Sequence, residues 1–385
     1  VFRSPHSFTG EDVVEITCHG GMFVVQKALR VVLACGAVPA EPGEFSKRAF
    51  LNGKIDLSGA EGIMTLINSR AEQGVTAALN VLEGSLSKEL GKITESLTEI
   101  CAHISAWVDY PDDEIEEIDE AKIINTLRKS EGTLQRLLDK FDSGMAVTTG
   151  VDAAIIGKPN AGKSTLMNLL LGYDRSIVTD VKGTTRDVVE ETANVDGSIL
   201  RLSDTAGIRD TDDTVEKLGV ERSLEKIKRC AVVLAVFDSA EELSGEDEEL
   251  IELCKGRPVI PILNKTDKPC LIDKEKIRIA LGEPTEISAS TGEGLQELKD
   301  RINTVLGTHD FDPNAAMLAN ERQRQCCVNA LASIKEAKDA LSMGVTLDAV
   351  GVCIDDAISY LLELTGQKAS QAVIDKVFSN FCVGK

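Results

Sequence analysis

Three features are missing from this chain of 385 residues, and each absence excludes a class of protein. No apolar run approaches the ~18 residues that a membrane-spanning helix needs, so no membrane partner is expected. No charged-then-apolar signal segment follows Val1, and a start at Val1 rather than at methionine leads us to expect that further residues precede it in the whole protein. The ten cysteines form no Cys-x-x-Cys pair, and disulfide frameworks belong to short secreted chains. We therefore expect reduced thiols and a cytoplasmic location.

Basic residues are also scarce: 42 lysines and arginines stand against 63 aspartates and glutamates, for a net charge of −21. Such a surface repels phosphate backbones on average, so a protein of this composition that acts on nucleic acid needs a local basic patch or a basic partner. The densest acidic run, DYPDDEIEEIDE at 109–120, holds eight acids and no base. It is typical of a solvated helix start or linker, and a partner-docking or ion-responsive surface is the alternative.

The spacing of apolar residues changes along the chain. In the first segment, EDVVEITCHGG predicts a strand and MFVVQKALRVVLACG predicts a helix that ends at Gly36. From Leu57 to about Trp107, and again over 115–141, apolar residues recur at helical spacing. From about Val147 buried strands alternate with helices, and TANVDGSILRLSD predicts a hairpin with an Asp-Gly turn. After about Gly307 the helical pattern resumes.

These changes predict a multidomain protein of α/β and α class. We expect an α+β N-terminal domain at 1–52, a discontinuous helical domain at 53–146 and 308–385, and an α/β domain at 147–307 inserted between its two parts. The helical stretches on either side of the insertion are expected to pack together.

A phosphate-binding loop is predicted at GKPNAGKS, 157–164, because it fits G-x-x-x-x-G-K-[ST], follows an apolar strand and opens a helix. The glycines let backbone N–H groups wrap the phosphates. Lys163 is expected to bind the β- and γ-phosphates, and Ser164 is expected to ligate Mg²⁺. Together with the base-recognition and switch motifs that follow it, this loop predicts that the inserted domain is a Ras-like P-loop G domain.

The base is predicted from NKTD, 264–267, which follows another buried strand. The Asp267 carboxylate can accept hydrogen bonds from guanine N1–H and its exocyclic amine, a pair that adenine does not offer. The stem of Lys265 can lie over the ring. The small residues of SAS, 288–290, are expected to close over the base.

The switch elements are predicted at DTAG, 204–207, and GTTRD, 183–187. Asp204 would hold Mg²⁺ through water, Gly207 N–H would meet the γ-phosphate, and Thr185 would be the second hydroxyl on Mg²⁺. The place where Ras-like GTPases carry a water-orienting glutamine holds Ile208, which cannot position water. Glu216 is a candidate for this role, and an exposed carboxylate at a helix start is the alternative.

Taken in order, GKPNAGKS, GTTRD, DTAGIRDT, NKTD, SFTGEDVVEITCHGG, PGEFSKRAFLNGKIDLSGAE and the tail FCVGK resemble the MnmE (TrmE) family of tRNA modification GTPases over essentially the whole chain. The family's first segment is missing from the match. The resemblance implies a homodimer that acts with the flavoprotein MnmG on C5 of the wobble uridine in certain tRNAs. It also implies a one-carbon unit from 5-formyl- or methylene-tetrahydrofolate, and dimerisation of the G domains when K⁺ is bound.

The resemblance assigns residues to each ligand. K⁺ would be held by Asn160, Thr179, Val181 and Thr184, and Glu216 would orient the attacking water. Mg²⁺ would be held by Ser164 and Thr185. GTP or GDP would be contacted by Asn160, Ala161, Gly162, Lys163, Ser164, Thr165, Thr179, Asp180, Val181, Lys182, Gly183, Thr184, Thr185, Asp204, Thr205, Ala206, Gly207, Asn264, Lys265, Asp267, Ser288, Ala289 and Ser290.

For the folate, the resemblance points to Glu15, Lys54 and Lys385, whose charges suit the pterin ring and the folate carboxylates. It makes Cys382 a residue needed for modification and not for GTP hydrolysis, with its chemical role open. Two other functions stay open at this point: a ribosome-assembly or signalling GTPase, and a folate-binding transfer protein with a regulatory GTPase inserted.

Overall fold

The computed structural model describes residues 1–109, 119–172, 191–204 and 230–381. The chain forms two compact units. The first comprises 1–67, 78–141 and 314–385, and the second comprises 68–77 and 142–313. No helix among the described residues is long and apolar enough to cross a membrane.

The second unit is a three-layer α/β domain around a sheet of order β2-β3-β1-β4-β5-β6. β2 pairs antiparallel with β3, and the other pairs are parallel. The strands are β1 (Val151–Ile156), β2 (Glu191–Val195), β3 (Ser198–Asp204), β4 (Val232–Asp238), β5 (Val259–Asn264) and β6 (Thr285–Glu286). The helices are α7 (Phe141–Thr148), α8 (Lys163–Gly172), α10 (Gly245–Cys254), α11 (Lys274–Leu281) and α12 (Leu295–Val305).

The central strands are apolar on both faces, and their alternating side chains divide between two cores. On β4, Val232, Leu234 and Val236 face the core that α8 and α12 cover, whereas Val233 and Phe237 face the core that α10 and α11 cover. Every residue of β4 is buried, as expected of a parallel strand covered on both faces. The predicted hairpin is confirmed: β2 and β3 join through Asp196 and Gly197, whose φ values of 49° and 103° suit a primed turn.

The first unit is largely helical. Its helices are α1 (Met22–Ala34), α2 (Glu44–Leu51), α3 (Leu57–Asn68), α4 (Glu72–Leu82), α5 (Ser85–Asp109), α6 (Glu120–Asp139), α13 (Glu321–Ser342), α14 (Leu347–Thr365) and α15 (Gln371–Ser379). The last residue of α3 and the first half of α4 are grouped with the second unit.

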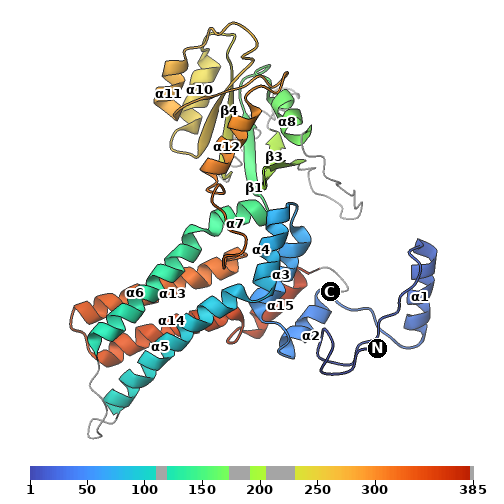
Figure 1. The fold of residues 1–385 in the computed structure, drawn as a ribbon, viewed down its shortest axis with the longest axis vertical. Helices are drawn as coiled ribbons and strands as arrows, with labels where there is room; N and C mark the ends of the chain where they lie inside the picture. Colours follow the sequence, from blue (N-terminus) through green and yellow to red (C-terminus); the bar gives the residue numbers. More distant parts are fainter. Residues whose placement is uncertain (110–118, 173–190, 205–229, 382–385) are drawn as a thin grey trace, which may run out of the picture. The chain divides into compact units, whose positions relative to one another are not determined.

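The helices on either side of the α/β insertion pack together, as the sequence predicted. α13 contacts both α14 and α6, and α14 contacts α5, which makes a bundle of four long helices (Figure 1). Fully buried leucines at helical spacing on α5 and α6, such as Leu90, Leu97, Leu127 and Leu134, form its interior.

A buried ion pair ties α3 to this bundle. The Arg322 guanidinium donates to both Glu61 carboxylate oxygens at 2.8 Å, and it also donates to the backbone oxygens of Glu363 at 3.1 Å and Leu364 at 2.9 Å. The Gln323 amide adds a hydrogen bond of 2.6 Å to the same carboxylate. The Glu61 side chain is only 9% exposed, so its charge depends on these donors.

We expect Arg322→Ala to lower the free energy of unfolding by ~3–5 kcal/mol, because it leaves the Glu61 carboxylate buried without its main partner. The measurement is urea unfolding followed by circular dichroism. Arg3→Ala is the matched control, since Arg3 pairs with Asp12 in the same unit but is 78% exposed, and it should cost less than ~1 kcal/mol. Equal losses in the two variants would contradict the assigned importance of the buried pair.

The N-terminal segment departs from the expectation of an α+β domain. The helix predicted after Gly21 is present as α1, but EDVVEITCHGG forms no strand and contributes only an isolated bridge between Val13 and Phe2. A strand needs a neighbouring backbone to take its N–H and C=O groups, and among the described residues only Phe2 supplies one. Val14 and Ile16 are accordingly exposed, and α1 buries none of its residues.

Candidate nucleotide site

The predicted phosphate loop lies between β1 and α8 and has the backbone that phosphate wrapping needs. Asn160 and Gly162 have φ values of 63° and 95°, in the left-handed region. A side chain at Gly162 would lie 2.1 Å from Asn264 Nδ2, and one at Gly157 would lie 2.3 Å from the Val236 carbonyl oxygen. Both glycines are therefore required by close backbone approach as well as by conformation.

The loop ends at the start of α8, where Lys163, Ser164 and Thr165 occupy the first turn. The Lys163 amine donates to the Gly157 carbonyl oxygen at 3.0 Å and to the Lys158 carbonyl oxygen at 2.8 Å, so it lies across the mouth of the loop. The hydroxyls of Ser164 and Thr165 are exposed. Backbone N–H groups at a helix N-terminus favour an anion, and a lysine beside them adds a full positive charge.

Asn264 joins the phosphate loop to the base-recognition loops. It ends β5 and is 2% exposed. Its amide nitrogen donates to the Ala161 carbonyl oxygen at 2.9 Å, and its amide oxygen accepts from the Ala289 N–H at 3.0 Å. One buried side chain therefore fixes the spacing between the loop predicted to bind the phosphates and the loop predicted to close over the base.

The base-recognition residues are held by two further contacts. Ser288 Oγ donates to Asp267 Oδ1 at 2.7 Å and lies 3.0 Å from Ser290 Oγ. The hydrogen bond from Ser288 lowers the pKa of Asp267, so its carboxylate is ionised and acts only as an acceptor. Lys265 has a φ of 67°, and its amine donates to Asp238 Oδ2 at 2.5 Å. That contact fixes the end of the Lys265 side chain beside the carboxyl end of β4.

Two supporting residues were missed from the sequence. Asp238 is 3% exposed at the end of β4, and its position as an acid at the carboxyl end of a buried strand was the available signal. Lys158, inside the phosphate loop, pairs with Asp247 at 3.1 Å and with Glu241 at 2.8 Å. Nothing in the local sequence of the loop indicated these partners, because they come from 80 or more residues away.

The metal ligands are only partly within the described residues. No group of three or more His, Cys, Asp or Glu side chains suited to a metal ion occurs in the part of the chain that the structure describes. Mg²⁺ in a nucleotide site takes a hydroxyl and phosphate oxygens, and the exposed Ser164 hydroxyl at the start of α8 fits that role. Asn160, the predicted K⁺ ligand, is also exposed on the loop.

The switch segments and the tail lie outside the described residues. The backbone of Asp204 is described: it ends β3 and is in register with Ile155 of β1, two residues before the phosphate loop. Among the predicted site residues, those outside the description are Thr179, Asp180, Val181, Lys182, Gly183, Thr184, Thr185, Thr205, Ala206, Gly207, Glu216, Cys382 and Lys385.

The predicted folate residues belong to the first unit. Glu15 and Lys54 are both exposed, and a side chain at Gly10 would lie 3.2 Å from Lys54 Cε. Phe381, the residue directly before Cys382, is buried, in contrast to Glu15 and Lys54. It is 6% exposed, and its ring centroid lies 5.2 Å from that of Phe378. A side chain at Gly43 would lie 2.9 Å from Phe381 Cβ, so the base of the tail packs against the start of α2.

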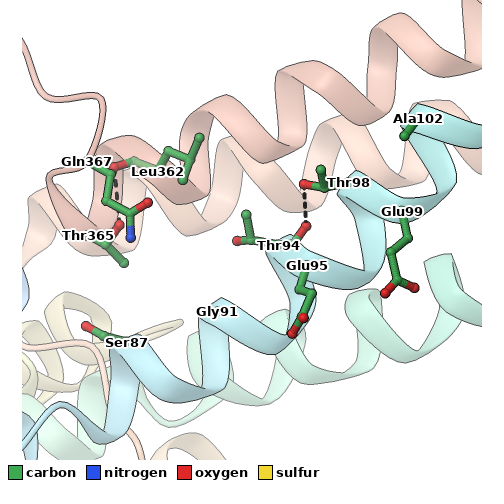
Figure 2. Close-up of a pocket in the computed structure, with 10 residues that line it drawn as sticks. All are labelled: Ser87, Gly91, Thr94, Glu95, Thr98, Glu99, Ala102, Leu362, Thr365 and Gln367. Atoms are coloured by element: carbon green, nitrogen blue, oxygen red, sulfur yellow. Dashed lines mark hydrogen bonds between the residues drawn. The ribbon is translucent and has the colours of Figure 1, made fainter. Parts of the chain in front are cut away.

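A hollow of about 540 Å³ between α5 and the end of α14 was not predicted (Figure 2). Its polar lining consists of hydroxyls, the Gln367 amide and two carboxylates, those of Glu95 and Glu99, with no lysine or arginine. Thr94 and Thr98 donate back to their own helix, to the carbonyl oxygens of Leu90 and Thr94. Two carboxylates without a cation make this lining unfavourable for a phosphate.

Comparison with known proteins decides between the GTPase classes. The model of the MnmE helical domain matches residues 57–382, and that of the GTP-binding protein TrmE N-terminus matches residues 1–54. The chain belongs to the MnmE family of tRNA modification GTPases. The MnmE match covers both parts of the helical domain and the G domain between them, which favours this family over the other two functions.

Similar curated proteins agree. The tRNA modification GTPase MnmE of Alkaliphilus oremlandii is 42% identical over 100% of this chain and 84% of its own length. The tRNA modification GTPase MnmE of Clostridioides difficile is 40% identical over 100% of this chain and 84% of its own length.

Solved G domains are also similar. The FeoB G domain of T. maritima is 28% identical and covers 40% of this chain and 98% of its own, with a TM-score of 0.31. A score this low supports no further inference.

Proposed function

We propose that this chain is a K⁺-activated GTPase that, with the flavoprotein MnmG, modifies C5 of the wobble uridine of certain tRNAs. The added group is aminomethyl or carboxymethylaminomethyl, and its carbon comes from 5-formyl- or methylene-tetrahydrofolate. The observation that carries the proposal is the connected phosphate and base site of an MnmE-family chain, in which Asn264 bonds to both Ala161 and Ala289.

Guanine selection follows from the charge at Asp267. Its carboxylate is ionised and held by Ser288, so it offers only acceptors to the base. Guanine presents two donors there, N1–H and the amine. Adenine would leave a charged acceptor unpaired, at a cost of ~1–3 kcal/mol or more. The Lys265 stem, held by Asp238, covers the ring.

GTP hydrolysis needs a group that orients the attacking water and a positive charge that stabilises the transition state. In this chain neither is supplied by the residue that Ras-like enzymes use. Ile208 occupies the place of the water-orienting glutamine, and we assign that role to Glu216. For charge stabilisation we assign a K⁺ held by Asn160 with Thr179, Val181 and Thr184. When bound, K⁺ supplies positive charge beside the β- and γ-phosphates, as an arginine finger does elsewhere. Lys163, and Mg²⁺ held by Ser164 and Thr185, would complete the neutralisation of the phosphate charge.

The modification chemistry is assigned to the first unit. Glu15 suits the amine and ring N–H of a pterin, and Lys54 and Lys385 suit folate carboxylates. The apolar α1, whose Met22 and Phe23 are more than 70% exposed, supports homodimerisation through the N-terminal region.

We propose that the N-terminal domain comprises residues 1–52 and that the G domain comprises residues 147–307. The two parts of the helical domain are then residues 53–146 and 308–385.

Cys382 provides the test of this proposal. In a reaction that contains the chain, MnmG, tRNA, folate, GTP and KCl, we expect Cys382→Ser to abolish tRNA modification and to leave GTP turnover unchanged. The reason is that Cys382 follows Phe381, which packs in the first unit, whereas GTP is bound in the second. Modification is measured by mass spectrometry of the tRNA nucleosides. Cys353→Ser, on α14, is the matched control and should retain both activities. Full modification by Cys382→Ser would contradict the assignment.

A further inference from the structure

Four cations gather on α5 and α6 in a protein whose net charge is −21. Lys88 and Lys92 are four residues apart on α5, and Lys129 and Arg136 are seven apart on α6, so each pair lies on one side of its helix. All four are exposed. We call them the α5–α6 basic face.

A hollow of about 370 Å³ lies at this face. Both α5 lysines line it, together with Ser85, Glu89, Ile93, Thr133 and Ala316. Arg136 stands beside it, because its guanidinium donates to Thr133 Oγ1 at 3.0 Å. Three cations from two helices therefore converge on one opening.

The cations are weakly neutralised. The Lys88 amine donates to the Glu83 carbonyl oxygen at 3.1 Å, and within the described part of the chain Lys88, Lys92 and Lys129 pair with no carboxylate. Arg136 contacts Glu89 at 3.4 Å, where the side chains are 67% and 34% exposed. A surface pair of this kind contributes ~0–1 kcal/mol, so Arg136 can exchange Glu89 for another anion at little cost.

The same hollow also contains a hydroxyl that has no partner in the part of the chain that the structure describes. Ser85 begins α5, and its Oγ is buried without a hydrogen-bond partner among the described residues. A buried hydroxyl without a partner costs free energy that an added acceptor recovers. The N-terminal end of the 25-residue helix α5 adds favourable potential for an anion at the same place.

Acidic and basic residues are divided along the length of α5. Glu95 and Glu99 line the hollow that α5 shares with α14 (Figure 2), whereas Lys88 and Lys92, nearer the N-terminus of the helix, line the hollow near α6. At 0.1 M salt, exposed charges are screened beyond ~10 Å, so the excess acids elsewhere on the protein do not cancel a local basic surface. An approaching polyanion is therefore directed to the N-terminal part of α5, where the lysines lie, and away from Glu95 and Glu99.

We propose that the α5–α6 basic face binds the phosphate backbone of tRNA. The inference rests on the proposed function and adds where the helical unit holds its substrate. Flexible lysines and hydroxyls around an open hollow suit phosphate oxygens without reading bases, so the face positions tRNA and does not select its sequence. This face supplies the local basic patch that an acidic protein needs in order to act on nucleic acid.

The test compares two variants of equal charge. Lys88→Ala/Lys92→Ala removes two charges from the face. Lys335→Ala/Lys368→Ala removes two exposed charges from α13 and from the turn after α14 in the same unit. Binding of fluorescent unmodified tRNA is measured by anisotropy with the whole chain and its flavoprotein, as the increase over flavoprotein alone, from 50 to 200 mM KCl. GTP hydrolysis without tRNA and affinity for the flavoprotein are measured in parallel.

We expect the Lys88/Lys92 variant to bind tRNA roughly tenfold to a hundredfold more weakly, with a salt dependence about two counterions less steep. The control should bind within about twofold of the unchanged chain, since its charges do not touch the RNA. GTP hydrolysis should be equal in all three.

The outcomes that overturn the proposal differ from one another. Equal losses in the two variants would mean that only net charge matters. Unchanged binding in both would leave the proposed function standing and remove this face from it. Loss of flavoprotein affinity with tRNA binding retained would make the face a site for an acidic protein surface. If the unchanged chain adds no tRNA binding at all, both this inference and the proposed function fail.

Discussion

Asp267→Asn is expected to weaken GTP binding about a hundredfold or more and to make the site accept xanthosine triphosphate. The carboxylate accepts two hydrogen bonds from guanine, and hydrogen bonds to a charged group contribute ~1.5–3 kcal/mol each. An asparagine amide turns one acceptor into a donor that faces the guanine amine. Xanthine has an oxygen at that position, so the same amide donor regains a partner. The measurement is competition of each nucleotide against a fluorescent analogue.

The structure supplies a control for this substitution. Ser288 Oγ can still donate to the oxygen of an asparagine, so the loop contact at 2.7 Å is retained and the change falls on the base. Asp273→Asn removes the same charge from the same domain. Asp273 caps α11 by accepting from the Lys276 N–H at 3.1 Å, and asparagine caps equally well, so this variant should bind GTP normally. GTP binding that Asp267→Asn leaves intact would disprove the role of Asp267.

GTP hydrolysis in KCl is expected to exceed hydrolysis in NaCl by about a hundredfold or more, since an arginine finger contributes 10³–10⁵ in related enzymes. Amide and carbonyl oxygens spaced for K⁺ do not all reach the smaller Na⁺. Asn160→Ala should abolish most of the difference, because it removes the side-chain oxygen assigned to the ion. The measurement is phosphate release at saturating GTP in each salt.

The backbone at Asn160 calls for a second variant. Its φ of 63° is unfavourable for alanine, so Asn160→Ala disturbs the phosphate loop as well as removing the amide. Asn160→Gly removes the amide and tolerates the conformation. If K⁺ acts through the amide, the two variants lose the KCl advantage alike. A glycine variant that keeps it would assign the alanine effect to backbone strain, and equal rates of the unchanged chain in both salts would exclude the K⁺ mechanism.

The sequence by itself determined those parts of the site whose chemistry lies in a contiguous stretch. GKPNAGKS and NKTD each come at the end of a buried strand, and each carries its turn and its functional side chains within eight residues, so local spacing sufficed to predict both loops. The Asp-Gly turn likewise predicted the β2–β3 hairpin, and apolar residues at three- and four-residue spacing predicted the long helices. The N-terminal strand was predicted wrongly, because strand propensity is realised only where another backbone pairs with it.

Tertiary structure alone decided how these parts act together. Asn264 contacts Ala161 and Ala289, Lys265 contacts Asp238, and Arg322 contacts Glu61 over 261 positions of sequence. Lys88, Lys92 and Arg136 form one face only because α5 and α6 pack side by side. Such contacts depend on which elements the hydrophobic cores bring together, and no local pattern records them. The sequence specified the chemical groups, and packing of the cores brought them to working distance.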